Sequence, residues 1–245
     1  MPIQNTTAIV IHVADQGESD KLVTFYTPQL GKLTAIAKGA KRSIKRFVNK
    51  LELFSLLSIT YHDQYSIPII SEASLINSYL TIRNTYSSYI QGILVCELIR
   101  NWTHENDTDK SLFQYVMWFL SHLNRTENGI NYLLLFLAKF YNQLGFQPSI
   151  SACSSCGMLD QMTGPFSFKP STGGILCQEC SHENKPSIPL SISTLKLLQK
   201  AFELPASKLS RLHFLPQSSS EALLLFKRYD RFLLDRELQS WNFIS

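Results

Sequence analysis

The spacing of hydrophobic positions changes near residue 78. Before that point, short segments rich in β-branched and aromatic residues alternate with turns that contain Gly, Pro and charged residues, a pattern typical of β-strands. Five strands closed on themselves favour an OB-fold barrel, although strand spacing alone does not separate it from other small barrels. Turns are indicated at residues 16–18 and 27–31. The predicted strands cover residues 6–13, 21–26, 32–37, 53–61 and 67–72.

Beyond residue 78, hydrophobic residues recur at helical intervals. Cys96 falls on the apolar face of the first predicted helix, where we expect it to be a small residue of the core. Gly145 stands where a helix C-cap is expected and Pro148 prevents continuation, so one helix is predicted to end just before the first cysteine pair. Serine residues followed by Glu221 indicate a capped start for the last helix. Helices after the first are predicted over residues 111–123, 129–144, 192–202 and 219–238.

These patterns predict an α+β fold in two domains. Residues 1–79 are expected to form a five-stranded OB-fold barrel, and residues 80–245 an all-helical domain with an embedded four-cysteine zinc ribbon at about residues 150–183. A content of 44% hydrophobic and 17% charged residues is typical of a globular chain. No apolar run approaches the ~18 residues of a membrane span, and the N-terminus lacks a signal-peptide pattern. We therefore expect a cytoplasmic protein without a membrane partner.

Four of the five cysteines form two CxxC pairs separated by twenty residues. Each CxxC turn supplies two thiolates from one tight loop, so two turns close the tetrahedral shell of a structural zinc ion and leave no position for water. Reduced thiols or two redox pairs are the alternatives, but a redox CxxC is expected to open a helix in a βαβ unit. His182 is predicted to be a surface residue. The predicted ligands are Cys153, Cys156, Cys177 and Cys180.

The formal net charge is only +4, but its distribution is uneven. The stretch between residues 32 and 50 holds seven basic residues and no acidic one. In an OB-fold, a connection at this place borders the binding face, where cations follow phosphates and aromatic residues stack on bases. A solvated surface helix is the alternative. The candidate DNA-binding residues are Lys32, Lys38, Lys41, Arg42, Lys45, Arg46 and Lys50. The candidate residues for stacking on bases are Phe25, Tyr26, Phe47, Phe54 and Tyr61. At least half of these five rings are expected to lie in the core instead.

Two other charged groups favour structural roles. Asp15, Glu18 and Asp20 lie on one short turn, where carboxylates are expected to cap and solvate the turn rather than bind magnesium. The last helix interleaves basic residues with acidic ones at helical spacing, so local ion pairs are expected there. Those residues are Lys227, Arg228, Arg231 and Arg236 with Asp230, Asp235 and Glu237.

No motif for catalysis is visible, since the chain lacks a phosphate-binding loop, an HExxH motif and a nucleophile elbow. We therefore expect a protein without enzymatic activity. A nuclease is an alternative, and magnesium-dependent cutting of DNA would distinguish it from a protein that only binds DNA. A second alternative is an OB-fold module that binds RNA. A binding competition between DNA and RNA strands of matched sequence would distinguish it from a DNA-binding protein. A protein adaptor whose apolar groove holds an acidic peptide is another.

The N-terminal region contains GESDKLVTFYT at residues 17–27, LGKL at 30–33 and AKGAKR at 37–42. These segments resemble the start of the RecO family of recombination mediators. The resemblance extends to LFSLL at 53–57, the helical middle and the double CxxC. It covers nearly the whole chain.

The resemblance implies an OB-fold, a helical domain with a zinc ribbon, and binding to single- and double-stranded DNA. It further implies strand annealing, association with RecR, contact with the C-terminal tail of single-strand-binding protein, and help for RecA in displacing that protein during DNA repair. On this sequence it places DNA binding at Lys32, Lys38, Lys41, Arg42, Lys45 and Arg46, and zinc at the four cysteines.

Overall fold

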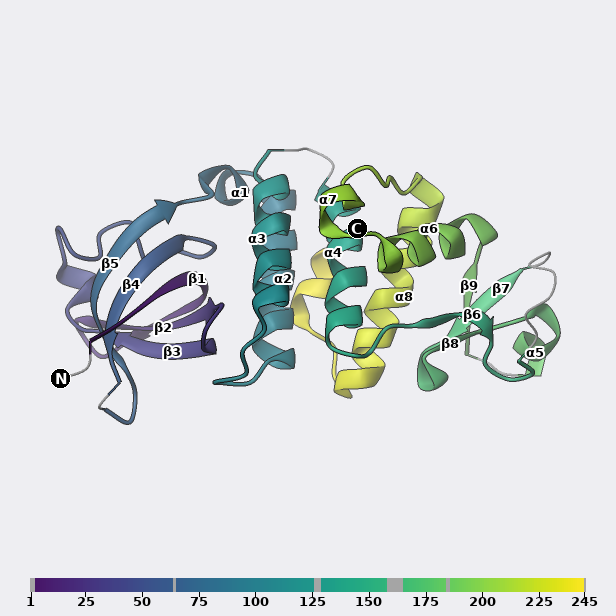
Figure 1. The fold of residues 1–245 in the computed structure, drawn as a ribbon, viewed down its shortest axis with the longest axis horizontal. Helices are drawn as coiled ribbons and strands as arrows, with labels where there is room; N and C mark the ends of the chain where they lie inside the picture. Colours follow the sequence, from purple (N-terminus) through teal and green to yellow (C-terminus); the bar gives the residue numbers. More distant parts are fainter. Residues whose placement is uncertain (1–2, 64, 126–128, 158–164, 184–185, 245) are drawn as a thin grey trace. The chain divides into compact units, whose positions relative to one another are not determined.

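The computed structural model describes residues 3–63, 65–125, 129–157, 165–183 and 186–244 and divides into two compact units, Met1–Thr126 and Glu127–Ser245 (Figure 1). Strands dominate the start of the first unit, and helices with a small sheet form the second, which confirms the predicted α+β class. The helices α1 Leu80–Asn84, α2 Tyr86–Trp102 and α3 Lys110–Leu123 belong to the first compact unit. The predicted domain boundary at residues 79/80 follows the change from strands to helices instead, and it stays a prediction.

Five strands of the first unit close into a barrel with the order β1-β2-β3-β5-β4. All neighbours pair antiparallel except β3 and β5, which meet in parallel where Ile36 pairs with Ile69. This order confirms the predicted OB-fold. The first strand is long enough to pair with β4 through its first half and β2 through its second. The strands are β1 Ile3–Gln16, β2 Asp20–Thr27, β3 Gly31–Ala37, β4 Leu56–His62 and β5 Ile69–Asn77.

The barrel is filled by alternate strand positions, such as Val23 and Phe25 on β2, as the pleat of a strand requires. The connection between β3 and β4 contributes Phe47 and Leu51 to the same core. This connection begins with the short 3-10 helix η1, Ala40–Arg42. Its two apolar anchors hold the basic stretch against one end of the barrel.

The fourth strand begins later than predicted, because residue 54 turns the chain instead of extending it. Phe54 has a φ of 70° and a fully buried ring, which packs edge-on against Tyr89 at 5.8 Å between centroids. A Cβ atom at Gly92 would lie 2.8 Å from the Phe54 ring. Gly92 therefore lets α2 approach the barrel. The helices of this unit are α1 Leu80–Asn84, α2 Tyr86–Trp102 and α3 Lys110–Leu123.

The predicted interior position of Cys96 on α2 is confirmed, since its side chain is buried. Burial raises the pKa of the Cys96 thiol to about 12, so the group stays neutral and apolar. The next helix, α3, begins one residue before its predicted start, and the Asp109 carboxylate caps it by accepting a hydrogen bond from the Leu112 N–H at 2.9 Å.

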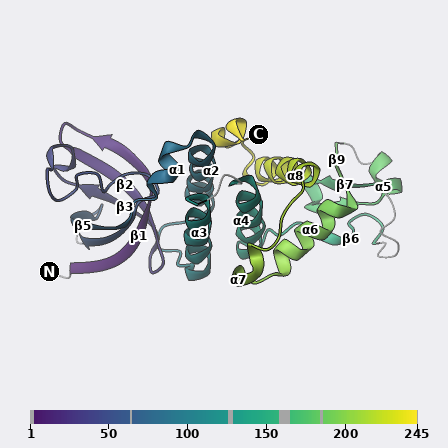
Figure 2. The same cartoon turned by 90° about the horizontal axis from the view of Figure 1, so that it is seen from above.

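In the second unit, α4 and α6 pack against α8 and each other (Figure 2). The predicted stop of α4 is confirmed: the helix ends at Gln143 and Gly145 follows with a φ of 79°. Among described residues, no helix is both long and apolar enough to cross a membrane. The helices are α4 Gly129–Gln143, α5 Gln178–Glu183, α6 Ile192–Glu203, α7 Ala206–Leu209 and α8 Pro216–Leu234, followed by the 3-10 segment η3 Gln239–Phe243.

The last helix starts and ends earlier than predicted. Pro216 occupies its first turn, where a missing N–H costs nothing, and Asp235 ends it in the left-handed conformation. Glu221, expected to cap this helix, instead lies within it and serves α6. Its carboxylate accepts hydrogen bonds from the Ser191 N–H at 2.7 Å and the Thr194 hydroxyl at 2.6 Å. A sequence window sees only near neighbours, so this long-range cap was not predictable from local spacing.

A small four-stranded sheet with the order β6-β8-β7-β9 is inserted between α4 and α6 along the chain. Gly173 of this region lies close to the Tyr229 side chain of α8, which leaves no room for a larger residue. Its φ is 62°, and a Cβ atom there would lie 2.9 Å from the Tyr229 hydroxyl. The edge-on contact of Phe168 with Tyr229, 5.3 Å between centroids, also joins sheet and helix. The strands are β6 Ser149–Cys153, β7 Phe166–Lys169, β8 Gly174–Leu176 and β9 Ile188–Leu190, and the 3-10 turn η2 is Pro170–Thr172.

Candidate metal centre and nucleic-acid interface

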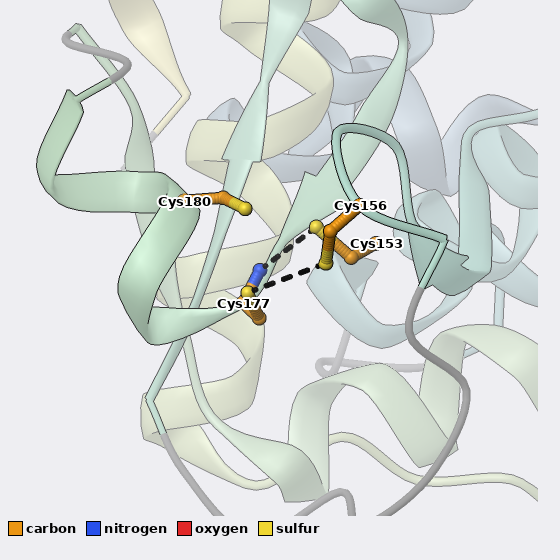
Figure 3. Close-up of side chains that lie close together, drawn as sticks. All are labelled: Cys153, Cys156, Cys177 and Cys180. Carbon is orange, nitrogen blue, oxygen red and sulfur yellow. Dashed lines mark hydrogen bonds between the residues drawn. The ribbon is translucent and has the colours of Figure 1, made fainter.

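Four cysteine side chains converge beside the small sheet (Figure 3). Cys153 ends β6 and Cys156 lies in the following turn, while Cys177 directly follows β8 and Cys180 lies within α5. The strands β6 and β8 pair in parallel, with Cys153 opposite Ile175. This pairing brings the two CxxC turns together although twenty residues separate them in the chain.

The geometry of the four sulfur atoms fits a metal site. All four lie within 4.8 Å of one another, and the Sγ atoms of Cys156 and Cys177 are 3.9 Å apart. Zinc–sulfur bonds of about 2.3 Å at tetrahedral corners place sulfur atoms about 3.8 Å apart. The cysteine cluster can therefore hold a metal ion of this size without rearrangement of the fold.

Backbone N–H groups favour the thiolate form of Cys153. The Cys177 N–H donates to the Cys153 Sγ at 3.4 Å. Burial by itself would raise the pKa of the Cys153 thiol, but hydrogen bonds from the N–H groups of Cys156, Cys177 and Ser155 outweigh burial and lower the pKa to about 6. Since the thiolate is the ligating form, the local backbone prepares this side chain for a cation.

His182 does not belong to the cluster formed by the described metal-binding side chains, and its side chain is exposed in α5. This agrees with its predicted surface position. No disulfide joins the described cysteines, so the cluster is not a pair of disulfides.

Three connections meet at one end of the barrel: residues 17–19, residues 38–50, and the connection from β4 to β5. The Lys41 N–H donates to the Ser19 carbonyl at 2.9 Å, which joins the first two. The Ile36 N–H donates to the Pro68 carbonyl at 2.8 Å, which brings the third beside the end of β3. We call residues 38–50 the cationic segment.

The cationic segment presents most of its basic side chains to solvent. Lys41 pairs with Asp15 at 3.0 Å, and the Arg46 guanidinium donates to the Lys38 carbonyl at 2.7 Å. The Lys50 ammonium is partly withdrawn, because it donates to the carbonyls of residues 45, 46 and 73 at 2.8 to 3.2 Å. The exposed basic residues are Lys38, Lys41, Arg42, Lys45 and Arg46.

Lys32 lies apart from the cationic segment, on β3. Its ammonium donates to the carbonyls of Arg100 at 2.9 Å and Thr103 at 2.8 Å, at the C-terminal end of α2. Carbonyls at a helix C-terminus lack intrahelical partners and carry partial negative charge, so a cation stabilises them. In this structure Lys32 therefore caps a helix, a role that its sequence neighbourhood did not indicate.

Two of the three carboxylates expected to stabilise the turn between β1 and β2 do so from the strand ends that flank it. Asp20 accepts hydrogen bonds from the Gly39 N–H and the Ser19 hydroxyl, each at 2.8 Å. The Gly39 N–H, with smaller contributions from Ser19 and nearby lysines, lowers the pKa of the Asp20 carboxyl. Asp15 pairs with Lys41. Both groups thus hold the turn and the cationic segment together.

None of the five candidate stacking residues offers a face to a base. Phe25, Tyr26 and Phe54 are fully buried, and Phe47 and Tyr61 are 3% and 5% exposed. The expectation that at least half of these rings lie in the core is confirmed, and none of the five remains a stacking candidate, because barrel closure turns each ring into the core or against a helix. The exposed aromatic ring among described residues of the barrel, 3–63 and 65–79, is Tyr65, at 56%. Sequence reasoning missed it, since a tyrosine in a polar turn has no periodic signal.

Basic residues of the last helix form ion pairs, but their partner Glu237 lies beyond the helix and not at the helical spacing that was predicted. Glu237 pairs with Lys227 at 3.3 Å and with Arg231 at 3.4 Å. Asp230 differs from its neighbours: it is fully buried and accepts hydrogen bonds from the Tyr141 hydroxyl at 2.7 Å and the Trp241 indole at 3.0 Å. This carboxylate therefore ties the C-terminal residues to α4.

A second surface feature lies in the second unit, where an apolar cavity of about 510 Å³ opens between η2, β9 and α8. Its walls include the exposed side chains of Leu224 and Phe232 together with Ile188. Lys169 and Arg228 supply positive charge, and no acidic residue is among its lining residues. The cavity therefore suits an apolar group joined to a negative one.

The fold and its sites define an OB-fold protein with a cationic barrel end and a helical unit whose four clustered cysteines can hold a metal ion. Residues 1–79 match the family described as Recombination protein O N terminal, and residues 83–242 match Recombination protein O C terminal. The chain therefore belongs to the RecO family of DNA repair and recombination proteins.

Several proteins named DNA repair protein RecO are similar to the chain over most of its length. The protein of Syntrophobacter fumaroxidans is 28% identical over 245 residues, covering 100% of this chain and 98% of the relative. That of Desulfatibacillum aliphaticivorans is 32% identical over 206 residues, covering 81% and 79%. A relative from a Roseiflexus species is 28% identical over 244 residues, covering 99% and 85%. The matches to the first and third of these proteins extend over both units of the chain.

Proposed function

We propose that this protein is a non-enzymatic mediator that binds single- and double-stranded DNA at the cationic end of its barrel. In this role it anneals complementary strands and, with RecR, helps load RecA onto DNA covered by single-strand-binding protein. It acts in the cytoplasm, on the DNA of the nucleoid. Membership of a DNA repair family supports the process, and the exposed cations at the barrel end support the site.

The observation that carries the DNA site is the clustering of Lys38, Lys41, Arg42, Lys45 and Arg46 on one exposed connection. Each contact with a phosphate releases condensed counterions, so binding through such a segment weakens steeply as salt rises. Cations that neutralise phosphates on two strands at once lower the repulsion that opposes annealing. Strand annealing is thereby a consequence of charge and requires no covalent step.

The test is a fluorescence-anisotropy titration of a single-stranded oligonucleotide across a salt series. Replacing Lys41, Arg42, Lys45 and Arg46 by alanine is expected to weaken binding and reduce the salt slope by up to about 2.8, at about 0.7 per phosphate contact. A control variant removes the same charge from exposed residues of the second unit: Lys196, Lys200, Lys208 and Arg211 to alanine. Equal losses in the two variants would refute this site.

We further propose that the metal of the cysteine cluster is zinc and that its role is structural. Support comes from the four-thiolate donor set, whose sulfur spacing fits zinc and which leaves no ligand position open for water. The ion would be held by Cys153, Cys156, Cys177 and Cys180, and would fix the turns after β6 and β8.

A second candidate function is peptide docking at the cavity beside α8. We assign to it the C-terminal tail of single-strand-binding protein, a partner that the family resemblance implies. The combination of apolar walls with Lys169 and Arg228 supports an acidic peptide as occupant. Charge reversal by Arg228→Glu is expected to abolish binding of a labelled tail peptide and to leave DNA affinity unchanged. The control is Arg211→Glu, which lies outside the cavity lining; unchanged peptide binding by Arg228→Glu would refute the assignment.

A further inference from the structure

Tyr65 is placed beside the cationic segment by the pairing of the barrel strands. It lies in the connection from β4 to β5, whose end is fixed by the hydrogen bond from the Ile36 N–H to the Pro68 carbonyl and by the pairing of Ile36 with Ile69. The Lys38 ammonium lies 6.0 Å from the centroid of the Tyr65 ring. A phenol ring and an exposed ammonium group therefore stand next to each other at the surface.

The exposure of this ring is unusual for the barrel. The other tyrosines and phenylalanines of the described barrel residues are at most 5% exposed, whereas Tyr65 is 56% exposed. Ile67, two residues further on, is also exposed, at 37%. OB-folds use the connection between their fourth and fifth strands as one of the surfaces that bind oligonucleotides. The ring thus occupies a position where a base can reach it.

We propose that Tyr65 is a base-stacking platform that gives the protein a preference for single-stranded over duplex DNA. This inference rests on the proposed DNA-binding function. Aromatic side chains bind unpaired bases through their faces, regardless of base identity. In a duplex those faces are already stacked on neighbouring bases, so a duplex gains only from phosphate contacts such as the one at Lys38. The aromatic contact therefore adds affinity for one form of DNA and not the other.

The test compares a single-stranded oligonucleotide with a duplex of the same length in anisotropy titrations at fixed salt. Tyr65→Ala is expected to weaken single-strand binding by about tenfold, within the range of about 5- to 150-fold that stacking platforms contribute. Duplex affinity and the salt slope for single strands are expected to stay unchanged, because no phosphate contact is lost. Tyr65→Phe, which keeps the ring, is expected to bind like the wild type.

Tyr86 offers a matched control, since it is 70% exposed but opens α2 outside the barrel-end connections. Tyr86→Ala is expected to leave both affinities unchanged. Tyr65→Trp adds a direct readout, because stacking on a base is expected to quench the added indole fluorescence with single strands only. Wild-type single-strand affinity in Tyr65→Ala, or an equal loss for the duplex, would overturn the inference.

The outcomes also separate this inference from the proposed function. If replacing the cations weakens binding but Tyr65→Ala does not, DNA binding at the barrel end stands and the stacking role is wrong. If the wild-type protein binds neither single strands nor duplex, the proposed function itself fails.

Discussion

Replacing Lys32 by alanine distinguishes a helix-capping lysine from a DNA-binding one. Both of its hydrogen bonds go to carbonyls at the end of α2, and the bond to Thr103 is the more buried. Hydrogen bonds from a charged group contribute about 1.5–3 kcal/mol each. Water can replace the ammonium at the exposed Arg100 carbonyl, so we count one bond and expect a loss of about 2 kcal/mol in the free energy of unfolding.

Urea denaturation followed by tryptophan fluorescence measures this loss, and Trp102 at the end of α2 places a reporter near the change. A loss of about 2 kcal/mol corresponds to a melting temperature lower by about 4–8 °C. The salt slope of single-strand binding is expected to stay at the wild-type value, because no phosphate contact is removed.

Lys45 differs from Lys32 because its side chain is exposed on the cationic segment, where it is expected to contact DNA and not to stabilise the fold. Lys45→Ala is expected to keep wild-type stability and to reduce the salt slope by about 0.7. If Lys32→Ala kept full stability while its salt slope fell like that of Lys45→Ala, the capping role assigned to Lys32 would be wrong.

Two further predictions concern the second unit. Replacing Cys153 by serine, or removing metal with a chelator, is expected to lower thermal stability before it affects single-strand affinity, because the metal holds the fold of this unit; full stability of the metal-free protein would contradict a structural metal. Burial by itself would raise the pKa of the Glu221 carboxyl, but hydrogen bonds from Thr194, Ser191 and Gln217 outweigh it and lower the pKa. A lowered folded-state pKa means that its stabilisation is present above the unfolded value of about 4.3 and is lost as pH falls through the folded value. Glu221→Gln is therefore expected to lower the free energy of unfolding at pH 7 by about 1 kcal/mol, after allowance for solvent screening. In urea titrations between pH 5 and pH 3, this variant is expected to lose less stability than the wild type. Equal pH dependence of the two proteins would refute the assignment.

The elements of the fold were predictable because they depend on local pattern. Short β-branched and aromatic segments between turns indicated five strands, and the helical period after residue 78 indicated the longer helices. Gly145 and Pro148 ended α4 as predicted, since a left-handed glycine and a proline act through their own backbone. The predicted boundaries of the elements were wrong where a contact with a residue distant in sequence decided the backbone conformation. Phe54 turns the backbone because its ring packs against α2.

The cysteine cluster was also predictable, because two CxxC turns carry their ligand geometry within four residues each. The roles of individual lysines and aromatic rings were not. Lys32 lies 68 residues from the Arg100 carbonyl that it binds, and the exposure of Tyr65 follows from barrel closure.

By itself, the sequence determined the five barrel strands, the longer helices, the two CxxC turns and the position of the cationic segment, since each is encoded by residues close together in the chain. Only the tertiary structure decided which cations stay exposed, which aromatic ring can meet a base, and that Glu221 caps α6. Those properties depend on contacts between residues distant in sequence, and closing the barrel and packing the helices create these contacts.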